Sequence, residues 1–131
     1  MSPTPIYSNP TTLGPPVASY SHVSRAGDLI HLAGQTGRDR AGTIPPGITA
    51  QVEQALENIR LALDSQGSDL SRVLKLTIYL TDRAHIAEFE ATLERVLRPH
   101  CADGYPPSTL LLVAGLANPA MLVEIDAVAQ A

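Results

Sequence analysis

The sequence predicts an α+β domain in which two helices pack on one face of a mixed β-sheet. Two segments with a helical period, 48–65 and 86–97, are separated by a segment of strict alternation, 71–80. Short β-type segments precede and follow this central part, which gives the order ββ-α-β-α-ββ. Because 131 residues suffice to bury one core, residues 1–131 are expected to form a single domain.

The first part of the chain is expected to be an extended arm followed by a hairpin. Five of the residues 1–17 are prolines, which favour extended backbone, and a short strand is expected at 6–7. Segments 19–24 and 28–33 are short β candidates. The glycine-containing turn between them, residues 25–27, predicts the hairpin.

The segment 48–65 is predicted to be an amphipathic helix, because its apolar residues recur at helical spacing and Gly67 follows as a stop signal. Its apolar stripe consists of Val52, Ala55, Leu56, Ile59 and Leu63. The segment 86–97 is predicted to be the second helix, which Thr81-Asp82 caps and which ends before Pro99.

The alternating segment 71–80 is predicted to be the central strand. One of its faces carries Leu74, Leu76, Ile78 and Leu80, and the other carries Val73, Lys75, Thr77 and Tyr79. The two helices can cover only one face, and the second is too apolar to be fully wet. We therefore expect it to meet copies of itself in a closed homo-oligomer, whose crevices could hold a small molecule. Two apolar β-type runs, 109–114 and 121–129, complete the sheet.

The bulk properties argue against several classes of partner. A net charge of -4 and scattered Lys and Arg residues give no reason to expect nucleic acid. The longest apolar run, Leu110–Ala114, is far short of the ~20 residues that cross a bilayer, so no membrane partner is expected. A start without a secretory pattern and a single cysteine, Cys101, favour a cytoplasmic location.

Metal and nucleophile chemistry have little support. The histidines at 22, 31, 85 and 100 lack metal-site spacing, and one cysteine cannot build a thiolate cluster, so no metal or cofactor is expected. Cys101 follows His100, but neighbours in sequence seldom have the geometry of a catalytic pair. An incidental loop cysteine is therefore favoured.

Glu124 is the strongest candidate for chemistry, since it lies among Leu122, Val123 and Ile125 in an apolar run, where a charge usually has a partner or a task. It can be a structural carboxylate tied to a cation such as Lys75 or to backbone donors. Alternatively it lies in a partly dry crevice, where a raised pKa would let it position or deprotonate a water. These residues alone leave both interpretations open.

An ordered set of short motifs runs along nearly the whole chain, from about Ile6 to Ala129. The motifs are Tyr20-Ser21, Ile30–Gln35, Gln51 with Gln54, Asn58 and Gly67, Val73-x-Lys75-x-Thr77 with Asp82, Pro106–Thr109, and Val123–Ala129. Together and in this order they resemble the YjgF/RidA (Rid) family of imine-hydrolysing proteins. The resemblance implies a chorismate-mutase-like α+β fold and a homotrimer with three sites between subunits.

The resemblance also implies roles for single residues. In family members that act as deaminases, an arginine pairs with the carboxylate of a 2-imino acid and a glutamate helps a water attack the C=N carbon. Ammonia then leaves with a 2-oxo acid. By position, Glu124 takes the role of the glutamate, Tyr20 that of a substrate-orienting tyrosine, and Gly34 supplies a backbone N–H.

The chain departs from the family where the substrate would bind, and it is identified as a divergent member. Ser108, beside Thr109, replaces the substrate-binding arginine, and a serine cannot imitate a bidentate guanidinium. Ala33 replaces a serine next to Gly34, and His22 stands where a glutamine is common. These five positions are the expected substrate-binding residues.

The favoured function is hydrolysis of an imine, enamine or related C–N bond, with water activated by Glu124 and substrate oriented by Tyr20. Because Ser108 makes the site less cationic, the expected substrate is a neutral, aromatic or larger molecule rather than a simple 2-imino acid. The alternative is a non-catalytic trimer that binds a metabolite or docks on another enzyme. Ribonuclease activity is disfavoured by the negative charge. His22, Arg25 or His31 could supply a replacement cation, and the sequence places none of them in the site.

Overall fold

The computed structural model describes residues 4–131, and all of its strands belong to one mixed sheet with the order β1-β2-β3-β6-β4-β5. The strands are β1 (Ile6–Ser8), β2 (Val23–Ala26), β3 (Leu29–Thr36), β4 (Val73–Leu80), β5 (Ser108–Leu112) and β6 (Val123–Gln130). The helices are α1 (Ile48–Asp64) and α2 (Ile86–Leu97). Strands β4 and β5 are parallel, and the other neighbouring pairs are antiparallel.

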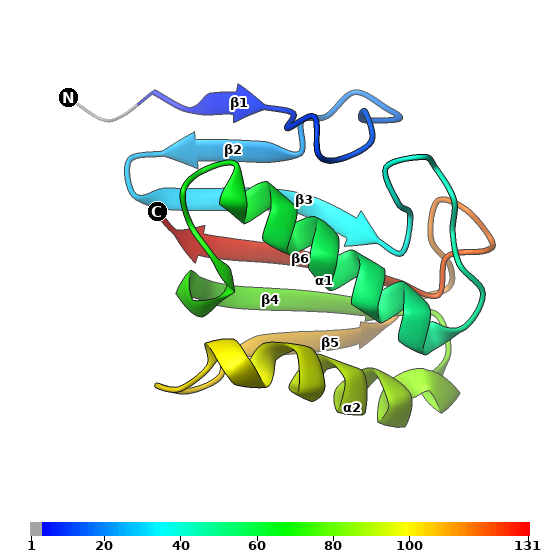
Figure 1. Cartoon of the computed structure of the whole chain (residues 1–131). Helices are drawn as coiled ribbons and strands as arrows, with labels where there is room; N and C mark the ends of the chain where they lie inside the picture. The colour runs from blue at the N-terminus through cyan, green and yellow to red at the C-terminus, as the bar shows by residue number, and fades with distance from the viewer. Residues whose placement is uncertain (1–3) are drawn as a thin grey trace.

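Both helices lie on the same face of the sheet (Figure 1), which confirms the predicted fold class. The core lies between them and the sheet, and the whole predicted stripe of α1 is buried. From α2, Phe89 is fully buried, while Leu93 and Val96 pack only partly against the core. The single domain over 1–131 stays a prediction, and residues 1–3 of the expected arm lie outside the described residues.

Glycines set both ends of α1. Gly47, with φ +89°, directly precedes Ile48, and Gly67, with φ +71°, follows the last turn and donates its N–H to Asp64 O at 3.0 Å. Both φ values lie in the left-handed region that favours glycine. The stop signal at Gly67 therefore works as predicted.

The N-terminal arm turns back on itself after β1. Leu13 donates its N–H to Pro10 O at 3.1 Å, and its side chain is only 6% exposed, in contact with the core. The segment from Asn9 to His22 is thus a packed loop at the end of the sheet, which matters for the cavity described below.

The hairpin forms, but the strand expected at 19–24 and the turn expected at 25–27 are both displaced. Strand β2 starts only at Val23, and Ala26 pairs with Leu29, so the turn is Gly27-Asp28. Gly27 adopts φ +59°, as a two-residue hairpin loop requires. Residues 19–22 lie outside the strand, and the buried His22 bonds through Nε2 to Gly14 O in the preceding loop.

On β4 the position predicted for Leu74 is wrong. Val73 pairs with Ala129 and Lys75 with Val128, so Leu74 is an extra residue in a β-bulge and is 44% exposed. Beyond the bulge the predicted alternation holds: Leu76, Ile78 and Leu80 are buried towards the helices.

The face of the sheet away from the helices is uncovered within the described chain. On β4 it carries Lys75, Thr77 and Tyr79, all half-buried, and Lys75 Nζ donates to Thr109 Oγ1 at 2.7 Å. Tyr79 donates its hydroxyl hydrogen to Asp126 Oδ2 at 3.2 Å. The face is thus mixed in polarity, as predicted. Within residues 4–131, no helix combines the length and the apolar character that crossing a membrane demands.

Candidate functional site

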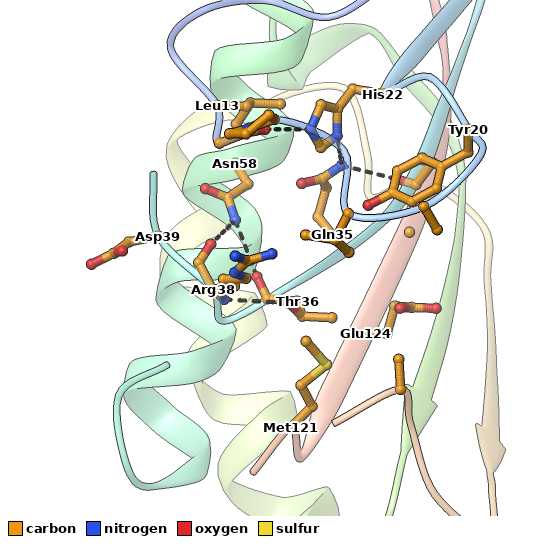
Figure 2. A pocket seen from close by; sticks show the side chains of 17 residues that line it. Leu13, Tyr20, His22, Gln35, Thr36, Arg38, Asp39, Asn58, Met121 and Glu124 are labelled. Carbon is orange, nitrogen blue, oxygen red and sulfur yellow. Dashed lines mark hydrogen bonds between the residues drawn. The ribbon is translucent and has the colours of Figure 1, made fainter. Parts of the chain in front are cut away.

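Three loops meet at one end of the sheet, where β1 and β3 end and β6 begins (Figure 1). A cavity of about 320 Å³ lies among them, and Figure 2 shows the side chains around it. Its walls include five of the residues that sequence reasoning selected, namely Tyr20, His22, Ala33, Gly34 and Glu124. The fold therefore brings these five residues, which are far apart in the sequence, to one cavity.

Glu124 enters the cavity from β6. Its neighbours Val123 and Ile125 are buried on the helix side, so Glu124 points to the opposite face, and it pairs with Thr36 on β3 and Tyr79 on β4. The carboxylate is half-buried at this position.

A β-bulge in β3 brings the backbone up to this carboxylate. Leu32 pairs with Ala127 and Gln35 with Ile125, so Ala33 and Gly34 together occupy the place opposite one residue of β6. A β-carbon added at Gly34 would lie only 2.6 Å from Glu124 Cδ. Glycine is therefore needed at 34 for a close approach to the carboxylate.

The surroundings of Glu124 disfavour its charge. Burial, and secondly the nearby negative charge of Asp126, raise the pKa of Glu124 above its usual value. Within residues 4–131 no ion pair or side-chain hydrogen bond of this carboxylate is found, and Lys75 bonds to Thr109 instead. The structural role with Lys75 as the partner of Glu124 thus lacks that partner.

His22 and Tyr20 form the wall opposite. His22 is 7% exposed, its Nε2–H donates to Gly14 O at 2.7 Å, and its Nδ1 accepts from Gln35 Nε2 at 3.2 Å. Both ring nitrogens are therefore hydrogen-bonded, which ties the N-terminal loop to β3. Tyr20 is 42% exposed and packs edge-on against this ring, with centroids 5.9 Å apart.

Ser108 and Thr109 are not brought into the cavity. Ser108 pairs with Leu76 on β4, whereas Glu124 pairs with Tyr79, three residues further along the strand. Adding the two-strand separation between β5 and β6, the Cα atoms of Ser108 and Glu124 are about 14 Å apart. Within one chain, the short side chain of Ser108 therefore does not reach Glu124, and neither Ser108 nor Thr109 lines the cavity.

Neither Arg25 nor His31 lines the cavity. Arg25 Nη1 donates to Gln66 O at 3.2 Å near the hairpin, and His31 is exposed on the uncovered face. The cavity instead contains Arg38, which sequence reasoning missed. The available signal was its place directly after Gly37, at the end of the strand that carries Gly34.

The described residues hold no cluster of three or more His, Cys, Asp or Glu side chains that could bind a metal ion. Cys101 is half-buried in a loop outside the cavity, and burial raises the pKa of its thiol, which disfavours the reactive thiolate.

A family model described as "Endoribonuclease L-PSP" matches residues 11–131. Protein HMF1 of Saccharomyces cerevisiae is 36% identical over 84 residues, which are 63% of this chain and 65% of that protein. The 2-iminobutanoate/2-iminopropanoate deaminase of Bos taurus is 32% identical over 122 residues, which cover 92% of this chain and 82% of that protein. The crystal structure of the YjgF gene product of E. coli shares the fold, with a TM-score of 0.89 at 23% identity over 95% of this chain and 98% of that one.

Proposed function

The chain belongs to the endoribonuclease L-PSP family, to which YjgF and RidA proteins belong, and from this membership we propose that it hydrolyses the C–N bond of an imine or enamine. The observation that carries the proposal is Glu124: its carboxylate lies against Gly34 in the cavity, and burial raises its pKa. A bovine relative named as a 2-iminobutanoate/2-iminopropanoate deaminase supports chemistry at a C=N bond.

In the proposed reaction, Glu124 takes a proton from water while the water oxygen bonds to the imine carbon. The π electrons of the C=N bond move to nitrogen, which takes up one proton from solvent, and a carbinolamine forms. Glu124 then returns its proton to the nitrogen, and the hydroxyl of the carbinolamine gives its proton back to solvent. Ammonia leaves with the electrons of the broken C–N bond, and a carbonyl compound remains.

The other walls of the cavity have binding roles in this proposal. The Tyr20 ring, fixed edge-on by His22, orients the substrate, and the bulge at Ala33 and Gly34 presents backbone polar groups beside Glu124. A simple 2-imino acid is not the proposed substrate, because Ser108 stands where the resemblance implies an arginine.

We also propose that the uncovered sheet face meets copies of itself in a homotrimer. The half-buried Thr77 and Tyr79 on that face would become buried in such an assembly. The trimer would bring Ser108 and Thr109 of the partner subunit to the cavity, which their own subunit cannot do. We also propose that the protein is located in the cytoplasm.

RNA cleavage is the weaker candidate, although the matched family model carries that description. Among the described residues that line the cavity, Arg38 is the one lysine or arginine, and the chain has a net charge of -4. Binding a nucleic acid backbone normally requires several cations in a row.

The test is ammonia release from freshly generated imines, some neutral and some with a 2-carboxylate. It compares the wild type with the Glu124→Gln variant and with Ser108→Arg. Release that depends on Glu124 and is faster with imines that lack a 2-carboxylate supports the proposal. No release from any imine, or release that Glu124→Gln leaves unchanged, would mean a non-catalytic binding protein or another mechanism.

A further inference from the structure

Arg38 is a charged side chain in the cavity that the proposed reaction does not use. It is half-buried, and within residues 4–131 no carboxylate lies within 4.0 Å of its guanidinium and no hydrogen bond from that group is found. The adjacent Asp39 accepts a hydrogen bond from Thr43 N at 2.9 Å, and Figure 2 shows its side chain directed away from the other labelled residues. The guanidinium donors of Arg38 are thus available to a ligand.

The position of Arg38 is fixed at its backbone. Asn58, buried on α1, donates from Nδ2 to Arg38 O at 2.8 Å and to Thr36 O at 3.1 Å. Arg38 N–H in turn donates to Thr36 Oγ1 at 3.3 Å. These bonds attach the end of β3 to the helix, so the arginine projects from a rigid support.

The tip of Arg38 lies beside Gly42. This glycine has φ +89°, and a β-carbon added there would lie 3.1 Å from Arg38 Nη2 and 3.5 Å from Nε. The guanidinium therefore lies against the loop after β3, in space that a side chain at 42 would take up.

Arg38 lies at a distance from Glu124. Glu124 pairs with Thr36, the last residue of β3, whereas Arg38 lies beyond the end of that strand. Figure 2 shows the two side chains on different sides of the cavity, with Thr36 between them. In a single ligand that reaches both residues, the anionic group on Arg38 is thus several covalent bonds away from the reacting carbon at Glu124.

We propose that Arg38 binds an anionic group of the substrate, so that the site selects imines whose carboxylate lies several bonds from the C=N carbon. A 2-carboxylate would lie next to Glu124 itself, where like charges repel and no arginine at 108 compensates. A distant carboxylate avoids this repulsion and gains charge-assisted hydrogen bonds. The inference rests on the proposed function, which places the reacting carbon at Glu124.

The test uses stable carbonyl compounds, which are product analogues, so that binding is measured without turnover. The probes are 4-oxopentanoate, with a distant carboxylate, 2-oxobutanoate, with an adjacent one, and neutral butanone. Calorimetric titration compares the wild type with Arg38→Gln and with Arg83→Gln. Arg83 is a matched control, because it is exposed, outside the cavity and without an ion pair in the described chain.

We expect the wild type to bind 4-oxopentanoate most tightly, and Arg38→Gln to weaken that binding about 10- to 100-fold. Binding of butanone should change less than about twofold, and Arg83→Gln should resemble the wild type. The inference is overturned if Arg38→Gln leaves 4-oxopentanoate binding unchanged, or if the wild type prefers 2-oxobutanoate or binds none of the probes. The proposed function fails separately, when ammonia release proves independent of Glu124.

Discussion

Glu124 and Gly34 determine each other's position: a β-carbon at Gly34 would lie 2.6 Å from Glu124 Cδ and 2.7 Å from Oε2. Contacts this short do not occur, so either the carboxylate or the bulge in β3 must move when residue 34 has a side chain. Because φ of Gly34 is not positive, the glycine is needed for space alone. The packing of two strands thus places the proposed base.

Replacing Gly34 with alanine should therefore displace the Glu124 carboxylate and lower kcat/KM about 100-fold, since a shift of about 1 Å in a catalytic group has an effect of this size. Gly115→Ala is the matched control, because nothing lies within 4 Å of a β-carbon there and it should behave as wild type. Steady-state ammonia release measures the effect. Glu124→Ala should raise the unfolding temperature more in the Gly34→Ala background than in the wild type, because only there does it also relieve the clash. An equal or smaller rise would contradict the steric coupling.

Replacing Glu124 with glutamine should stabilise the fold at neutral pH. The folded state raises the pKa of Glu124 above its unfolded value, chiefly through burial, so the folded protein binds this proton more tightly. The wild type then loses stability as pH rises through the raised pKa of Glu124. The glutamine variant has no carboxyl group that ionises at this position, so it does not lose stability in this way. Unfolding followed between pH 4 and pH 8 should show the variant's advantage at pH 8 and its disappearance near pH 4.

Glu90→Gln is the control for this experiment, since Glu90 is exposed on α2 and has no ion pair in the described chain. It should not change the pH dependence of stability. A Glu124→Gln variant less stable than the wild type at pH 8 would indicate a stabilising partner for the carboxylate and a structural role.

Asp126 should influence the pH at which the protein acts. Its charge is the second cause, after burial, of the raised pKa of Glu124, and its carboxylate accepts a hydrogen bond from Tyr79. Asp126→Asn removes the charge and keeps the shape, so the pKa of Glu124 should fall part of the way to its usual value. The acid limb of kcat/KM, where the base becomes protonated, should then move to lower pH. Tyr79→Phe is the control, since it leaves the charge of Asp126 in place, and an unmoved limb in Asp126→Asn would contradict the coupling.

Much of the fold follows from local pattern. The helical period of α1 and the glycine after it predict the helix, because burial of one stripe and a left-handed stop act within the segment. The bulges could not be predicted in the same way. Leu74 reads as a core residue in strict alternation, and its exposure depends on the register between β4 and β6, which is a property of the pair of strands.

Of the cavity, too, only a part could be predicted from the sequence. Glu124 and Tyr20 are recognisable from their motifs, and the fold brings both into the cavity. Arg38 was missed because it belongs to no motif, and it reaches the cavity through the bonds of Asn58 to the loop after β3. Ser108 stands where the resemblance implies an arginine, yet within one chain it lies about 14 Å from Glu124. Sequence resemblance does not say whether a second subunit completes the site.

The proposed trimer makes a specific prediction for hybrid oligomers. Ser108 and Glu124 are about 14 Å apart in one chain. In the proposed trimer, an arginine introduced at 108 acts instead beside the Glu124 of the partner subunit. Wild-type subunits should turn over 2-imino acids poorly, and subunits carrying both Ser108→Arg and Glu124→Gln should be inactive. Co-refolded mixtures should regain activity, because hybrid sites combine one subunit's introduced arginine with the other's carboxylate. A gain of about 10- to 100-fold over unmixed wild type is expected from a charge-assisted pair.

Light scattering on the same samples should give the mass of a trimer. A monomeric mass, or mixtures no more active than the sum of their parts, would place the whole site within one chain and remove the role of position 108.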